Sequence, residues 1–336
     1  MEFKEKMTEK KVDIIVPAFK AHHVLQRVLG SVIIQTAVDL VKITVVNDAD
    51  EKDYQEIINP FKKFVDIQEL KMEVNGGPGV ARQYGIDHTS CPYFTCVDAD
   101  DSFASPFAIE RLLVELERDP QIVANFGAFA EDHGNLTFLQ HNQDMIWMFG
   151  KMYRRSFIDK YQVRFNETRA NEDNGFNTQI RLLASETEKV NFIQDIVYYW
   201  RYKEDSITRI NNAEYSYNQS FPGYTTNMIY AIKQVRKRKP FNSQVDVWAI
   251  TVMASLYYYY MQTEARDKRF VEQNYKSCVE YYKEIFADIE TRFQKEHIDP
   301  IVSEVMNQQA PSMVGVVPSI DFYGFVAGLK KKANAK

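Results

Sequence analysis

The chain has 336 residues, 45% of them hydrophobic, and a formal net charge of -5 at pH 7. It is long enough for one large domain or two moderate ones, and its acidic balance argues against a general affinity for polyanions. Three cysteines form neither a disulfide framework nor a metal-ligand spacing, which favours a reducing compartment. Residues 1–11 lack the apolar segment of a signal peptide, and no stretch reaches the roughly 18 apolar residues of a membrane span. We therefore expect a soluble, cytoplasmic protein.

Short β-branched runs alternate with helical periodicities over the first hundred residues. After a flexible lead at residues 1–11, the sequence predicts strands at 12–16, 41–46, 67–74 and 93–97. Apolar residues at helical spacing predict helices at 21–36, at 54–64 and up to residue 88. This alternation predicts an α/β domain with a parallel sheet and right-handed crossovers.

The second half of the chain changes character. Beyond a helix that ends near residue 118, we expect strands at 122–130, 146–153 and 189–201, a polar loop at 131–143 and a helix at 176–185. From residue 214 on, long helical periodicities dominate, at 224–235, 245–262 and 270–286. We therefore predict one domain at residues 12–212 and a helical domain at 213–336, which binds the acceptor, mediates oligomerisation, or does both.

Three carboxylates, Asp98, Asp100 and Asp101, follow the buried apolar run at residues 91–96. Such a cluster repels itself and loses hydration unless a cation or several donors neutralise it. Mg²⁺ and Mn²⁺ prefer oxygen ligands and commonly bridge a carboxylate to substrate phosphates. A solvated acidic turn that caps the next helix is the alternative. We interpret the cluster as a metal–diphosphate site at the carboxyl end of a strand, where open α/β sheets bind ligands.

A glycine-rich loop at residues 75–82 precedes a predicted helix. Glycines such as Gly76 and Gly77 let the backbone approach a ligand closely, and a helix N-terminus favours negative charge. Arg82, in the first helical turn, is placed to bind phosphate oxygens with both ends of its guanidinium. An ordinary strand-to-helix turn explains the same glycines.

Three further positions point to a nucleotide and an acceptor. Phe19 follows the first strand and is suited to stack on a base, and Asp48 ends the second strand, where it is suited to accept from a base or a ribose. Core packing and helix capping are the alternatives. Asp173 lies at a predicted helix N-terminus, where it either takes a proton from an acceptor hydroxyl or only caps the helix.

Taken in order, these segments resemble family 2 glycosyltransferases with the GT-A fold, over about residues 12–208. The motifs that carry the resemblance are Pro17-Ala18-Phe19, Val46-Asn47-Asp48, Asn75-Gly76-Gly77 with Ala81-Arg82, Asp98-Ala99-Asp100-Asp101, residues 150–156, Glu172-Asp173, Tyr199-Trp200-Arg201 and the closing Asp205-Ser206-Ile207-Thr208. The family usually has Asp-Asp-Gly-Ser at the end of its second strand, where this chain has Asn47-Asp48-Ala49-Asp50.

The resemblance implies a fold, a reaction and a set of roles. The implied fold is a Rossmann-like sandwich with a mostly parallel central sheet, followed by a helical region. The implied reaction is an inverting, metal-dependent transfer of a sugar from a nucleotide-diphosphate donor, with UDP-sugars favoured, to an acceptor hydroxyl. By the same likeness Asp173 is the catalytic base and Asp100 binds Mn²⁺ or Mg²⁺. The donor-binding residues would be Pro17, Phe19, Asp48, Gly76, Gly77, Arg82, Asp98 and Ala99, with Glu172, Trp200 and Arg201 on the acceptor or donor side.

The acceptor is left open by the sequence as a glycan, a polymer or a modified nucleic acid. The family's processive synthases carry membrane helices and a Gln-x-x-Arg-Trp motif, and this chain has neither, which favours a single transfer. One alternative is the same chemistry on a hydroxylated base in DNA, supported by the basic residues at 233–239, which also fit a solvated helix end. Another is a non-catalytic nucleotide-sugar-binding module. A homo-oligomer through the C-terminal helices is a further expectation.

Overall fold

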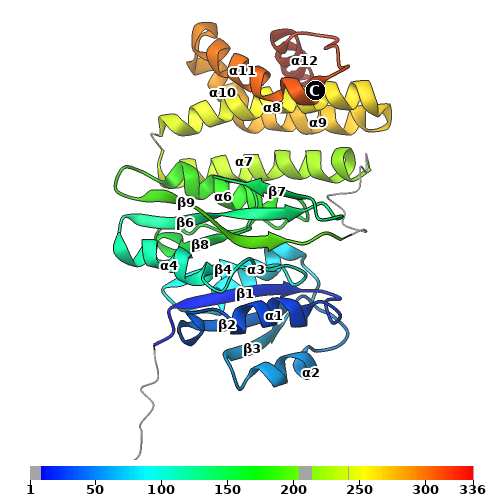
Figure 1. Cartoon of the computed structure of the whole chain (residues 1–336). Coiled ribbons are helices and arrows are strands. Elements are labelled where there is room, and N and C mark those ends of the chain that lie inside the picture. The colour runs from blue at the N-terminus through cyan, green and yellow to red at the C-terminus, as the bar shows by residue number, and fades with distance from the viewer. Residues whose placement is uncertain (1–8, 204–213, 241, 336) are drawn as a thin grey trace, which may run out of the picture. The chain divides into compact units, whose positions relative to one another are not determined.

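The computed structural model describes residues 9–203, 214–240 and 242–335 (Figure 1). The chain divides into two compact units, the first made of residues up to 169 together with 184–203, the second of 170–183 together with the chain from 204 on. The predicted boundary between residues 212 and 213 lies outside the described residues, as do most of the predicted N-terminal lead and the closing segment at 205–208.

A nine-stranded sheet organises the described part of the first unit. Its strand order is β3-β2-β1-β4-β8-β6-β9-β5, with β7 paired to β6. The neighbours from β3 to β4 run parallel, β8 runs antiparallel to both β4 and β6, and β9 runs parallel to β6. The strands are β1 Val12–Ala18, β2 Val41–Asn47, β3 Asp66–Lys71, β4 Tyr93–Cys96, β5 Ser102–Phe103, β6 Ile122–Asp132, β7 Phe138–His141, β8 Lys151–Arg154 and β9 Lys189–Trp200.

Helices pack on the sheet through apolar faces, which appear in the sequence as apolar residues at helical spacing. Helix α1 buries Leu25, Val28, Leu29 and Val32, a spacing that places all four on one side. Helix α3 packs against β1 and β2, and α4 packs against β6 and β9. The helices of this unit are α1 Leu25–Ile33, α2 Gln55–Ile58, α3 Pro78–Asp87, α4 Ala108–Arg118 and α5 Arg155–Tyr161.

The strand expected at 146–153 begins only at residue 151, as β8, and two other local predictions are wrong. The expected polar loop at 131–143 contains the end of β6 and all of β7, which pair antiparallel with Phe129 opposite His141. This hairpin turns through Gly134, Asn135 and Leu136, all with positive φ, and its outer strand is mostly exposed, so no buried alternation marks it in the sequence. The helix expected at 54–64 is short, because Pro60 has no N–H to donate to the preceding turn.

Helices make up the described part of the second unit. They are α6 Glu172–Leu183, α7 Phe221–Arg238, α8 Ser243–Arg266, α9 Val271–Tyr281, α10 Ala287–Arg292, α11 Lys295–Gln309 and α12 Phe322–Asn334. Helix α6 lies so close to α7 that a Cβ added at Gly175 would come within 2.9 Å of the Asn227 Cβ. No helix in the described ranges combines the length and the apolar character that crossing a bilayer requires.

Candidate active site

Three strands of the first unit end at one edge of the sheet. Strand β2 pairs in parallel with β1, with Ala18 opposite Asn47, and β1 pairs in parallel with β4, with Ile15 opposite Cys96. The segments that follow these strands carry Phe19, Asp48 and the 98–101 carboxylates. Because carboxyl ends of parallel strands meet at the same edge, the sheet brings these predicted residues into one region.

Asp48 holds the glycine loop. Its carboxylate is 3% exposed and accepts from the Gly76 N–H at 2.7 Å and from the Gly77 N–H at 2.9 Å. The Asn75 side-chain amide donates to the Asp48 carbonyl oxygen at 2.9 Å. Gly77 has a φ of +84°, which L side chains rarely adopt, and it directly precedes α3. Asp48 therefore orients the N-terminus of α3, and its role toward a base stays a prediction.

Arg82 and Asp98 form a largely buried ion pair. The Arg82 side chain, in the first turns of α3, is 5% exposed, and its Nη2 donates to the Asp98 Oδ1 at 2.6 Å. The pair ties the glycine-loop helix to the turn that follows β4. Arg82, predicted to bind phosphate, thus lies beside Asp98, predicted to bind the sugar donor.

Asp101 is used by the fold itself. It is 2% exposed, and it accepts from the Tyr198 hydroxyl at 2.6 Å and from the Arg201 N–H at 2.9 Å. These bonds fasten the end of β9 to the acidic turn. Burial, followed by the charges of Asp98 and Asp100, nevertheless holds the pKa of Asp101 well above its usual value.

Of the three carboxylates, Asp100 is the one whose partner side chain is most exposed. Its Oδ2 lies 3.7 Å from the Nζ of Lys203, whose side chain is 46% exposed. Burial and then the charge of Asp98 raise the pKa of Asp100, while Lys203 acts in the opposite direction. Ala99, between Asp98 and Asp100, is buried and adds no polar group to this turn.

The carboxylates of Asp98 and Asp100 fit a divalent cation that is also bound by a substrate. Within the described ranges, no three His, Cys, Asp or Glu side chains form a metal-binding group by themselves. Asp98 and Asp100 both offer carboxylate oxygens. Burial, and then the charge of Asp98, raises the pKa of Asp100, and a bound cation would offset both effects. Mg²⁺ is usually held by one or two carboxylates plus substrate phosphates, so an incomplete protein ligand set is the expected one.

Trp200 and Arg201 lie at the end of β9. The half-buried Trp200 ring packs at 5.0 Å from the Phe149 ring and 5.3 Å from the Trp147 ring, measured between centroids. The Arg201 guanidinium lies 5.0 Å from the Tyr199 ring centre, and its buried Nε has no hydrogen-bond partner among the described residues. A buried unsatisfied donor beside an acidic turn is unusual and is consistent with a ligand site.

Glu172 and Asp173 open α6 and belong to the second unit. Glu172 is buried, and Asp173 accepts from the N–H of Asn174 at 2.7 Å. Their charges, after burial, raise the pKa of Tyr215. The turn before them is set by Asn171, which has a φ of +60° and donates to Ser220. Because they lie in the second unit, their position relative to Asp100 stays a prediction.

Two of the five basic residues at 233–239 form ion pairs with carboxylates of their own unit. Lys233 forms an ion pair with Glu284, and Arg236 pairs with Asp246 at 3.2 Å. These contacts support the interpretation of a solvated helix end over that of a polyanion site.

Two groups of residues beside the predicted site were not predicted from the sequence. Lys203 escaped notice because its partner Asp100 is far away in the sequence. A network around Asp50 and Tyr54 also escaped it, although Asp50 in place of the family's usual serine was an available signal.

A family model for glycosyl transferase family 2 matches residues 13–170. Residues 13–170 belong to this family. It is 28% identical over 232 residues to the glycosyltransferase GlyA of Streptococcus pneumoniae, a match that covers 61% of this chain and 32% of GlyA. The chain thus spans about a third of that relative's length.

Solved structures show the same fold. A crystal structure of S. aureus TarS 1-349 in complex with UDP-GlcNAc superposes with a TM-score of 0.67 at 14% identity, covering 96% of this chain and 91% of that one. A mannosyltransferase of Pyrobaculum calidifontis in complex with GDP-Man and Mn²⁺ gives a TM-score of 0.50 at 10% identity, covering 97% of this chain and 87% of that one. The predicted family and the predicted GT-A fold with a helical C-terminal region are confirmed.

Proposed function

We propose that this family 2 protein is an inverting, metal-dependent glycosyltransferase that moves a sugar from a UDP-sugar to an acceptor hydroxyl. The observation that carries the proposal is the meeting of a glycine loop, an aromatic ring and two adjacent carboxylates at one sheet edge. UDP-GlcNAc in the complex of the TarS relative supports a nucleotide-sugar donor.

The donor nucleotide would lie along the ends of β1 and β2. Phe19, which is 47% exposed, offers its ring to the base, while Pro17 completes the strand that positions it. The N–H groups at the start of α3, held in place by Asp48, favour the negative charge of the diphosphate. The buried Ala99 keeps the acidic turn small beside the ribose or the sugar.

Asp98 and Asp100 would hold the divalent cation together with the donor diphosphate. When bound, Mn²⁺ or Mg²⁺ would neutralise the charge that builds on the leaving UDP. Arg82 orients Asp98 through its 2.6 Å bond. Lys203 is the residue that must leave Asp100, and its exposed ammonium can then face the phosphates.

Asp173 would take the proton of the acceptor hydroxyl. Placed at the N-terminus of α6, its carboxylate is stabilised as an anion by the helix dipole. A single in-line displacement at the anomeric carbon then inverts the configuration. Glu172, Trp200 and Arg201 would line the acceptor or donor side of the reacting sugar.

A binding screen followed by a transfer assay tests the proposal. UDP-, GDP- and TDP-sugars are tested by thermal shift with and without Mn²⁺, and we expect stabilisation by a UDP-sugar that EDTA removes. Asp173→Asn should retain that stabilisation and lose transfer, whereas Asp100→Asn should lose both. Wild-type transfer by the Asp173→Asn variant would refute the base assignment, and full activity in chelator would refute the metal site.

The acceptor and the assembly belong to the same proposal. Glycans, anionic polymers and DNA with a hydroxylated base should be compared as acceptors, each at low and high salt. Because Lys233 and Arg236 form ion pairs within the helical unit, we expect transfer to a glycan or polymer rather than to DNA. Light scattering of the purified chain would show whether its helices mediate a homo-oligomer.

A further inference from the structure

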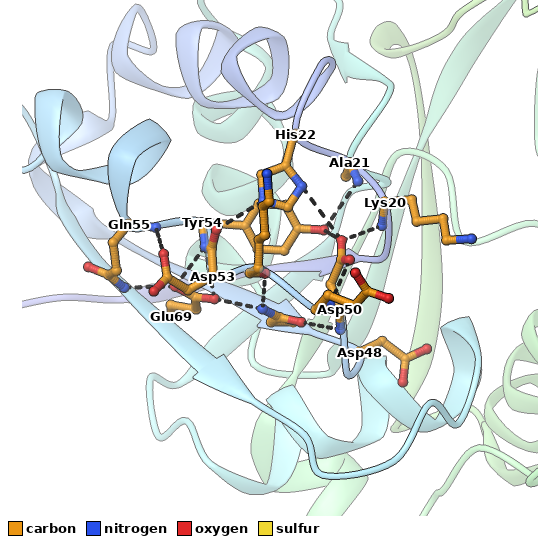
Figure 2. Close-up of polar contacts among 12 residues, drawn as sticks. Lys20, Ala21, His22, Asp48, Asp50, Asp53, Tyr54, Gln55 and Glu69 are labelled. Carbon is orange, nitrogen blue, oxygen red and sulfur yellow. Dashed lines mark hydrogen bonds and ion pairs between the residues drawn. The ribbon is translucent and has the colours of Figure 1, made fainter.

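A polar cluster, buried except for the ring of His22, joins the turn after β1 to the turn after β2 (Figure 2). We call Asp50, Tyr54 and His22 the turn cluster. Tyr54 is fully buried and Asp50 is 9% exposed, and both lie beyond the end of β2, whereas His22 lies beyond the end of β1. None of the roles assigned above uses these side chains.

Asp50 binds the turn that carries Phe19. Its Oδ2 accepts from the Lys20 N–H at 2.7 Å and from the Tyr54 hydroxyl at 2.8 Å. The Tyr54 oxygen in turn accepts from the Ala21 N–H at 3.1 Å. One carboxylate therefore fixes two consecutive amides, the first directly and the second through Tyr54 (Figure 2).

The fixed turn has an unfavourable backbone conformation. Lys20 has a φ of +52°, which residues with a Cβ rarely adopt. It directly follows Phe19, and its ammonium lies 5.3 Å from the centre of the Phe19 ring. Since such a conformation persists only where its surroundings hold it, the bond from Asp50 helps to fix the turn that follows Phe19.

The turn cluster maintains the charge of Asp50. Burial by itself would raise the pKa of Asp50, but the bonds from Tyr54, Lys20 and Glu51 outweigh it, and the pKa lies below its usual value. His22 stacks on Tyr54 with 4.3 Å between ring centres. Its Nε2 lies 2.9 Å from the Asp53 carbonyl, which can only accept, so this nitrogen carries a proton and Nδ1 faces Asp50 at 3.6 Å.

Asn47 makes this arrangement possible. Its Oδ1 accepts from the Asp50 N–H at 2.7 Å, and its Nδ2 donates to the Glu69 carboxylate at 2.9 Å. An aspartate at position 47 could make the first bond but would repel Glu69. Asn47 and Asp50 therefore form a matched pair. Where the family usually has an aspartate at position 47, this chain has an amide there and a carboxylate at position 50.

We propose that Asp50, acting through Lys20 and Tyr54, is the positioning residue that holds Phe19 against the nucleobase of the donor. Asp50 itself does not touch the donor in this proposal. The inference rests on the proposed function, because it assumes that a nucleotide binds at this sheet edge. It adds a determinant of base binding that is separate from the carboxylates at 98–101.

The test separates the base from the diphosphate. Dissociation constants are measured by calorimetry for UDP and for pyrophosphate, both with Mn²⁺, on wild type, Asp50→Ser, Asp50→Asn and Tyr54→Phe. We expect UDP to bind about tenfold more weakly to Asp50→Ser, which loses charge-assisted bonds, and a few-fold more weakly to Tyr54→Phe. Asp50→Asn keeps one acceptor oxygen and should be intermediate. Pyrophosphate should bind to all four proteins equally.

Asp13→Asn is the matched control. Asp13 is also buried and accepts from a backbone N–H, that of Cys91 at 2.7 Å, but it lies at the opposite end of β1. The control should lose stability without losing affinity for UDP. Equal UDP binding by wild type and folded Asp50→Ser would overturn the inference, as would equal losses for UDP and pyrophosphate. A wild-type protein that binds neither ligand would refute the proposed function itself.

Discussion

The replacement of Asp48 by asparagine tests how the glycine loop is held. In the structure the two oxygens of Asp48 accept from the N–H groups of Gly76 and Gly77 at 2.7 Å and 2.9 Å, in a site from which water is almost excluded. Asparagine has the same shape but keeps one acceptor oxygen. Its amide nitrogen would face an N–H group, so one donor of the loop loses its partner.

The size of the effect follows from these two bonds. A hydrogen bond to a charged group contributes about 1.5–3 kcal/mol, and a buried donor left unsatisfied costs about 1–3 kcal/mol. Since Asp48→Asn loses one such bond and weakens the other, we expect it to lower the free energy of unfolding by about 3 kcal/mol. For a domain of this size, that corresponds to a fall in Tm of roughly 6–12 °C.

Tryptophan fluorescence can report the first unit alone. The chain has three tryptophans, and Trp147 and Trp200 lie in the first unit while Trp248 lies in the second. In a Trp248→Phe background, thermal unfolding is compared for Asp48→Asn and for Asp53→Asn, a nearby exposed control that should change stability by less than about 0.5 kcal/mol. Equal midpoints for the two variants would refute the role of Asp48 in holding the loop.

Three further predictions concern other parts of the chain. Ala49 has a φ of +57°, so Ala49→Gly should leave the free energy of unfolding unchanged or raise it by up to about 1 kcal/mol in urea titrations, whereas Ala231→Gly within α7 should lower it by about 1 kcal/mol. Asp246 accepts from both terminal nitrogens of Arg292 at 2.7 Å, and these bonds hold its pKa below the usual value. Asp246→Asn should therefore cost about 2 kcal/mol at pH 7. That difference should shrink below about pH 4, where protonation removes the same bonds from wild type, and a pH-independent difference would contradict this account. Without the sugar donor, Lys203→Met should bind Mn²⁺ up to about fivefold more tightly than wild type, because the ion no longer has to displace an exposed ion pair. Electron paramagnetic resonance would measure this affinity. An unchanged affinity would show that Lys203 does not occupy the metal position.

The strands of the first half were predictable because burial on both faces leaves near-continuous apolar runs. Residues such as Ile14, Val45 and Phe94 are fully buried, and their β-branched or aromatic neighbours mark the same strands in the sequence. By contrast, β7 is a mostly exposed edge strand with no such signature. The assignment of α6 to the second unit was beyond sequence reasoning, because it depends on packing against α7, some fifty residues later.

The candidate site was predictable in its residue types and less so in its contacts. The acidic turn could be found because three carboxylates follow one buried strand. That Asp101 serves the fold could not, since its partner Tyr198 lies 97 residues away. Likewise, the bond from Arg82 to Asp98 depends on the placement of α3 beside the turn that follows β4, which the sequence does not give. The local sequence shows which charged and polar side chains are present. Their contacts in the folded protein determine which of them are available to a ligand.

The inserted position of α6 has a consequence for anyone who dissects this protein. The chain leaves the first unit after residue 169, builds α6, returns at 184 and leaves again after 203. Helix α6 is anchored by α7, where the Asn227 amide donates to the Ala170 carbonyl at 2.9 Å. A fragment that stops before α7 would keep the sheet but would leave α6, which bears Asp173, without the helix that it packs against. Exchanging the C-terminal helices between relatives would therefore replace the helices that hold α6, which bears the proposed base. Such chimaeras should exchange residues 170–183 together with the C-terminal helices.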